Sequence, residues 1–139
     1  MTSNAYQQMV FINLPVADLA VSKKFFTDLG YALNPQFSDD NAASFVISDT
    51  IIAMLLTKPF YATFTQKEIA DATKTSQVMI ALSAESREKV DELVDRALAV
   101  GGSQGNPTQD LGFMYGRSFD DPDGHTWEVA WMDPSAIEG

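Results

Sequence analysis

The residues best suited to chemistry lie near the C-terminus, around a single carboxylate. Glu128 follows an Asp-Pro-Asp-Gly turn at positions 121–124, in a stretch of residues that favour β-strands. The proline fixes φ at one turn position and the glycine permits positive φ at another, so this stretch predicts a β-hairpin. If Asp121 lies opposite His125, Ser118 lies directly across from Glu128. A carboxylate placed there can act as a general base or anchor a ligand amine or hydroxyl.

Alternation along the two strands predicts that Glu128 faces away from the hydrophobic core. Directly paired side chains share a face, which gives one set of Phe119, Trp127, Val129 and Trp131 and another of Ser118, Glu128 and Ala130. Other titratable residues have weaker functional cases. His125 in the turn is expected to be solvated, and Arg117, on the tryptophan face, is expected to make a structural bond or salt bridge. The pairs Asp39-Asp40 and Asp120-Asp121 are interpreted as solvated loop charges.

Composition limits the classes of partner. The chain has 139 residues, of which 45% are apolar, and this is enough for one domain or for two small modules. There is no cysteine, which excludes disulfides, thiolate metal ligands and a cysteine nucleophile. The net charge of −10 argues against nucleic acid or an anionic membrane as the main partner. We find no secretory signal and expect a cytoplasmic protein.

The first half of the chain reads as a strand, a helix and two further strands. Residues 9–16 alternate in hydrophobicity and predict a strand. A helix over 18–29 should follow, with an aspartate N-cap and Gly30 just after its end. Residues 43–47 and 50–56 predict two more strands.

The second half repeats this order. Residues 78–84 predict a strand, Ser86 caps an amphipathic helix, and the Gly101-Gly102 pair ends it before the hairpin. Residues 57–77 differ, because their aromatic side chains stand among polar ones. We interpret them as a connector containing a short helix over 65–73. The sequence thus carries an internal repeat of architecture.

Three of these stretches together resemble the vicinal oxygen chelate superfamily, which includes glyoxalases, extradiol dioxygenases, and fosfomycin- and bleomycin-resistance proteins. They are Val16-Ala17-Asp18-Leu19, Phe25-Phe26-Thr27-Asp28-Leu29-Gly30, and the hairpin turn before Trp127-Glu128. The likeness covers roughly residues 9–132. It implies an α+β fold in which two βαβββ modules form a curved mixed sheet around a cleft, and a homodimer. We expect one domain over 1–139, with modules over 9–58 and 78–132 and a connector over 59–77.

The resemblance also places four residues where metal-using relatives carry their ligands. These positions hold Phe11, Met54, Met79 and Glu128. A phenyl ring cannot ligate a divalent cation, and thioether sulfur is too soft for Mg, Mn, Ni or Zn. One carboxylate with water would hold such an ion weakly. We therefore predict neither a metal nor another cofactor.

The leading functional hypothesis is sequestration of a small apolar or aromatic molecule, which could carry a positive charge, in the manner of bleomycin-resistance proteins. The predicted site comprises Phe11, Asn13, Met54, Met79, Ala81, Ser118 and Glu128. An alternative is a glyoxalase-like lyase or isomerase, or a dioxygenase, that uses Glu128 as its base. A third is an interaction module whose cleft is filled by its own side chains. Glu128 could also be an inherited carboxylate that Ser118, Asn13 or water satisfies.

Overall fold

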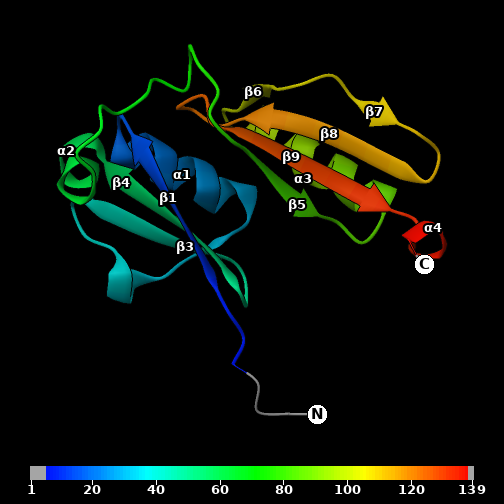
Figure 1. The fold of residues 1–139 in the computed structure, drawn as a ribbon, viewed down its shortest axis with the longest axis horizontal. Helices are drawn as coiled ribbons and strands as arrows, with labels where there is room; N and C mark the ends of the chain where they lie inside the picture. Colours follow the sequence, from blue (N-terminus) through cyan, green and yellow to red (C-terminus); the bar gives the residue numbers. More distant parts are fainter. Residues whose placement is uncertain (1–5, 138–139) are drawn as a thin grey trace. The chain divides into compact units, whose positions relative to one another are not determined.

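The structure, a computed structural model, describes residues 6–137 (Figure 1). The chain divides into two compact units, Met1–Ile69 and Ala70–Gly139, and the division falls inside the predicted connector. Each unit has its own mixed β-sheet and its own long helix. Among the described residues, no helix is long and apolar enough to cross a membrane.

The first unit is a βαβββ module whose order agrees with the prediction. Its elements are β1 (Val10–Val16), α1 (Leu19–Leu29), β2 (Ala32–Leu33), the 3₁₀ turn η1 (Pro35–Phe37), β3 (Ala42–Ser48) and β4 (Ile51–Thr57). The strand order is β1-β4-β3-β2, with β1 parallel to β4 and the other neighbours antiparallel. The parallel pair requires a crossover connection, and α1 lies within it.

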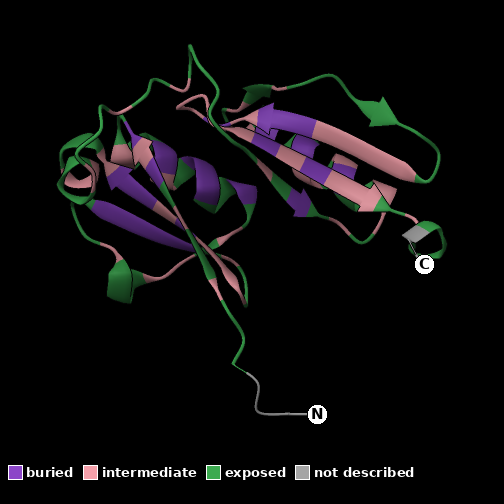
Figure 2. Ribbon diagram, viewed as in Figure 1, coloured by how far each residue is buried: buried purple, intermediate pink, exposed green. Residues whose placement is uncertain are grey.

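Helix α1 begins and ends at the residues that the sequence indicated. The Asp18 carboxylate accepts hydrogen bonds from the backbone N–H groups of Ala20 and Val21. Gly30 ends the helix in the left-handed conformation, at φ 113°. The helix packs on β3 and β4, and all three elements carry buried residues (Figure 2). The core of this unit is mostly apolar, and Ser22 and Ser44 are its buried polar residues among those described. Its main members are Leu14, Val16, Phe25, Phe26, Leu29, Phe45, Ala53 and Leu55.

The second unit repeats the order but breaks its edge strand in two. Its elements are β5 (Met79–Ser83), α3 (Arg87–Ala99), β6 (Ser103–Gln104), β7 (Gln109–Asp110), β8 (Met114–Asp120), β9 (Thr126–Met132) and α4 (Pro134–Ile137). The strand order is β5-β9-β8-β6, and β7 also pairs with β8. Strand β5 runs parallel to β9. The predicted α+β fold of two βαβββ modules is therefore confirmed.

The β8–β9 hairpin has the predicted register. Phe119 pairs with Trp127 and Ser118 pairs with Glu128, while the Asp121 N–H donates to the carbonyl of His125. The interpretation of Asp121 as a solvated charge is wrong, because this residue is only 5% exposed. Its carboxylate accepts hydrogen bonds from the turn itself, so it is a structural part of the hairpin.

The connector begins with a helix in a different place from the one predicted. Helix α2 spans Lys58–Tyr61 and continues as the 3₁₀ turn η2 over Ala62–Phe64. A proline in the first turn favours this start, because its missing N–H would have no helical partner there. Residues 65–73 form no helix, since the side chains of Thr65 and Asp71 bond to nearby backbone N–H groups instead.

Candidate functional site

The predicted site residues of the first unit lie together on the sheet face opposite α1, and we call Phe11, Asn13 and Met54 the first half-site. Strand β1 pairs with β4 in parallel, with Asn13 beside Met54, so these side chains share a face. This register settles the facing of Met54, which apolar residues on both sides of its strand had left open. Phe11 is 57% exposed, so the half-site presents apolar surface to its surroundings.

The predicted residues of the second unit likewise share the sheet face opposite α3, and we call Met79, Ala81, Ser118 and Glu128 the second half-site. Glu128 pairs with Ala81 on one side and with Ser118 on the other. Met79 begins β5 on the same face and is 59% exposed. Helix α3 packs against the opposite face, over the buried side chains of Phe119, Trp127 and Val129.

The partner of the Glu128 carboxylate is a residue that the sequence did not indicate. Asn106 Nδ2 donates a hydrogen bond to Glu128 Oε2 over 2.7 Å. The same nitrogen lies 3.4 Å from the sulfur of Met79. Ser118, one of the partners predicted for the acid, makes no such bond and is 5% exposed. Asn106 stands between a glycine and a proline, where the sequence has neither a strand nor a helix pattern. Hydrophobic periodicity therefore could not predict the direction of its side chain.

Asn106 reaches Glu128 because the edge strand bulges. Gln104 pairs with Phe119, and Gln109 pairs with Gly116. Four residues, 105–108, therefore stand opposite only two residues of β8, 117–118. We call residues 105–108 the β6–β7 bulge. Bulges of this kind redirect a side chain out of the regular alternation.

Gly105 lets the bulge lie directly on β8. A Cβ added to Gly105 would overlap Ser118 Oγ and would lie 3.1 Å from the backbone nitrogen of Phe119. The Gly105 N–H also donates to the carbonyl of Ser118 over 3.3 Å. The bulge covers the Ser118 hydroxyl, which has no hydrogen-bond partner among the described residues.

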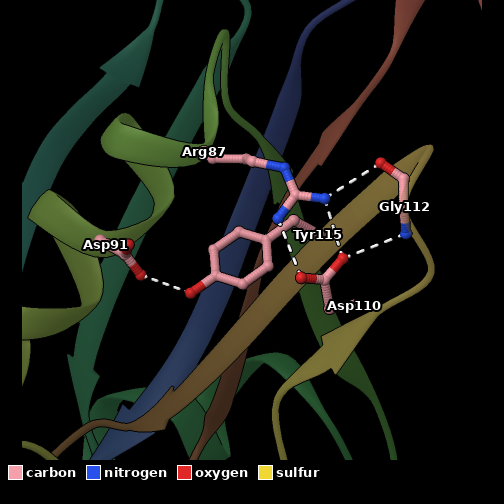
Figure 3. Close-up of polar contacts among 5 residues, drawn as sticks. All are labelled: Arg87, Asp91, Asp110, Gly112 and Tyr115. Atoms are coloured by element: carbon pink, nitrogen blue, oxygen red, sulfur yellow. Dashed lines mark hydrogen bonds and ion pairs between the residues drawn. The ribbon is translucent and has the colours of Figure 1, made fainter.

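A charged network ties the C-terminal side of the bulge to the start of α3 (Figure 3). Arg87 donates from both terminal nitrogens to the Asp110 carboxylate, over 3.0 and 2.8 Å, and also to the carbonyl of Gly112. The guanidinium lies over the rings of Tyr115 and Trp131, with its Cζ 4.9 and 5.3 Å from their centroids. A bidentate arginine that also lies over two aromatic rings has a well-defined position, and we call this contact the Arg87–Asp110 clamp.

The network continues along α3 through a second arginine. Arg117 Nη1 lies 2.9 Å from Asp91 Oδ1 and 2.8 Å from Asp95 Oδ1. The Tyr115 hydroxyl donates to the same oxygen of Asp91, and this bond together with Arg117 lowers the pKa of Asp91. Arg117 lies on the tryptophan face of β8 and makes salt bridges there, as predicted.

The clamp predicts an acid-dependent loss of stability. Arg87, chiefly through its hydrogen bonds, and the Gly112 N–H hold the pKa of Asp110 at about 2, below the ordinary 3.8. A carboxylate with a depressed pKa stabilises the fold above its unfolded pKa, and loses that contribution as pH falls through the folded pKa. Asp110→Asn should therefore be less stable than the wild type at pH 5. The difference should shrink between about pH 4 and pH 2, in urea unfolding followed at each pH. A constant difference would contradict the clamp.

The donor set does not suit the divalent ion that metal-using relatives bind. Of the four positions that the resemblance assigns to metal ligands, those of the first unit hold Phe11 and Met54, and those of the second hold Met79 and Glu128. These supply one carboxylate and two thioethers, and the carboxylate is bonded to an amide. Among residues 6–137, no three His, Asp or Glu side chains gather as a metal site.

Comparisons with known proteins agree with this architecture. Residues 8–48 match the family model described as bleomycin resistance protein-like N-terminal. The chain superposes on a hypothetical protein, SA1046, from S. aureus with a TM-score of 0.74 at 28% identity, covering 91% of this chain and 95% of that one. Residues 8–48 are thus similar to a bleomycin resistance protein-like family, and the fold is that of solved glyoxalase/bleomycin resistance/dioxygenase proteins. No curated protein matches the chain.

Further solved structures show the same fold at lower identity. A glyoxalase-related enzyme from Fulvimarina pelagi matches with a TM-score of 0.75 and 22% identity, over 91% of this chain and 88% of that one. The fosfomycin resistance protein FosX from Mesorhizobium loti matches with a TM-score of 0.65 and 15% identity, over 99% and 100%. At these identities the likeness concerns architecture, and function must be argued from the site itself.

Proposed function

We propose that this protein binds a small apolar or aromatic molecule at the predicted site residues on its sheet faces, without the divalent metal of its metal-using relatives. The observation that carries the proposal is the second half-site. There, Glu128 stands beside an exposed Met79 and an alanine, on the sheet face opposite the one that α3 covers. An apolar surface with one placed polar group is the usual composition of a small-molecule site.

The first half-site supports the same reading from the other unit. A large aromatic side chain, Phe11, is exposed on a sheet face, next to Asn13 and near Met54. Exposed apolar groups that gather on one face commonly mark ligand-binding or interaction surfaces. The flexible thioether of methionine adapts to ligands of varied shape. We also propose that the protein is cytoplasmic and that it forms a homodimer, as many relatives do.

Glu128→Gln tests the anchoring role of the carboxylate. Gln keeps the size and one acceptor oxygen but removes the charge, so binding should weaken about tenfold without being abolished. A thermal-shift screen over small aromatic and cationic compounds would first supply a ligand, because stabilisation follows occupancy. Calorimetric titration of both proteins then gives the affinity ratio. Asp40→Asn, which removes an exposed charge in the first unit, is the control and should bind as the wild type does.

Two results would contradict the proposal. One is a stoichiometric, tightly bound ion after dialysis against Ni, Zn, Mn or Fe, because the donor set described above cannot bind such an ion tightly. The other is a catalysed reaction that Glu128→Gln abolishes while ligand affinity is kept. That result would identify Glu128 as a base and favour the lyase, isomerase or dioxygenase alternative.

A further inference from the structure

Asn106 forms a hydrogen bond with the Glu128 carboxylate, the group to which a ligand would bind under the proposed function. Its carboxamide nitrogen donates to Glu128 Oε2 over 2.7 Å and approaches the Met79 sulfur. An amide N–H bound to a carboxylate is the contact that a ligand amine would make at the same place. The free protein therefore holds an internal substitute for a ligand donor against the one charged group of the second half-site.

The contact between Asn106 and Glu128 is made by the β6–β7 bulge, which is fixed at both of its ends. On one side, β6 pairs Ser103 and Gln104 with β8. On the other side, the Arg87–Asp110 clamp fixes β7 to α3. Between these fixed ends, Gly105 lies against β8 and Asn106 is exposed. Movement of the β6–β7 bulge would thus leave both flanking contacts intact.

We call the arrangement in which Asn106 contacts Glu128 closed. It leaves a buried hydroxyl without a hydrogen bond, and this free-energy cost favours opening. It covers the Ser118 hydroxyl, which finds no hydrogen-bond partner in the described part of the chain. A buried hydroxyl without a partner has lost its bonds to water and gained none in return. Lifting the bulge would return Ser118 to solvent or to a ligand, directly beside Glu128 in the sheet register.

We propose that Asn106 gates the Glu128 carboxylate, so that a ligand carrying a charged N–H donor, such as an aromatic ammonium compound, must displace it. This inference rests on the proposed function and adds the residue that sets ligand choice. An ammonium group forms a stronger hydrogen bond to a carboxylate than a neutral carboxamide does, and it can therefore replace Asn106. A ligand that offers only acceptors gains nothing from the exchange.

Two cations of equal charge separate gating from plain attraction. Benzylammonium has three N–H donors, and benzyltrimethylammonium has none. In NMR titrations of the full chain, Asn106→Ala should bind benzylammonium about tenfold more tightly than the wild type, and benzyltrimethylammonium less than about threefold more tightly. Gly105→Ala should act in the same direction, because its Cβ cannot fit against Ser118. Thr108→Ala changes an exposed side chain of the same bulge and should leave both affinities unchanged.

A measurement without ligand tests the closed contact directly. The side-chain amide protons of Asn106 should exchange with water slowly in the wild type and faster in Glu128→Ala. Equal exchange in the two proteins would overturn the gate. So would equal affinity of the wild type and Asn106→Ala for benzylammonium, although ligand binding itself would then stand. Failure of both cations to bind any variant would refute the proposed cationic ligand, and the gate with it.

Discussion

Replacing Asp121 by alanine is expected to destabilise the second unit by about 3 kcal/mol. The buried carboxylate accepts hydrogen bonds from the backbone N–H groups of Asp123 and His125, over 2.9 and 3.1 Å. Its other oxygen accepts from the indole nitrogen of Trp127 over 3.1 Å, and Trp127 is 1% exposed. Alanine would leave all three donors without this acceptor, and buried donors without partners are costly.

Urea unfolding followed by tryptophan fluorescence would measure this loss. The chain has two tryptophans, and both Trp127 and Trp131 belong to β9, so the signal reports on the second unit. Glu85→Ala removes an exposed carboxylate of the same unit and should stay within about 0.5 kcal/mol of the wild type. Asp121→Asn keeps one acceptor oxygen and should fall between the two. A loss below about 1 kcal/mol for Asp121→Ala would show that the turn forms without its side-chain bonds.

Periodic features were predictable from the sequence because each leaves a repeated signal. The β8–β9 register follows from the turn at 121–124, and the alternation around Glu128 then fixes which side chains face α3. Helix α1 was bounded by its aspartate cap and by Gly30, two residues whose conformations are locally determined. The facing of Phe11, Met79 and Glu128 followed from the same alternation.

Single non-local contacts were not predictable, since no pattern records them. Asn106 lies 22 residues from Glu128 along the chain and reaches it only because the edge strand bulges. The interruption of β-like residues by Gly105-Asn106-Pro107 was the available signal, and it marks a break without showing where the side chain points. The burial of Asp121 is similar, because its role depends on the position of the Trp127 indole.

The displaced connector helix shows how local bonds compete with helical ones. The sequence 65–73 contains several good helix formers, yet Thr65 Oγ1 accepts from the Lys67 N–H, and the Asp71 carboxylate accepts from the N–H and hydroxyl of Thr73. Such side-chain bonds offer the backbone an alternative to the helix. The turn that Asp71 closes lies against the hairpin, where the backbone of Ala72 and Thr73 stands beside Gly124.

Gly124→Ala is expected to cost about 3 kcal/mol, through two separable effects. Gly124 has φ +88°, a conformation that costs an alanine about 1–2 kcal/mol. An added Cβ would also lie 2.8 Å from the backbone of Ala72 and of Thr73, so that the turn at 71–74 must move. Gly112→Ala is the matched control. Gly112 has φ +84°, and among the described residues other than its two chain neighbours no atom lies within 4 Å of the position that its added Cβ would take.

The difference between these two alanine variants isolates the contact between the hairpin and the 71–74 turn. Gly112→Ala should lose about 1–2 kcal/mol, the conformational part alone, in the same fluorescence-detected urea unfolding. The further loss in Gly124→Ala then measures the displacement of the turn. Hydrogen exchange should locate it, with faster exchange at the Lys74 and Thr75 amides, which donate to the Asp71 carbonyl. Equal losses of unfolding free energy in both variants, with unchanged exchange at 74–75, would contradict this. They would mean that the 71–74 turn moves without cost and does not stabilise the hairpin that carries Glu128.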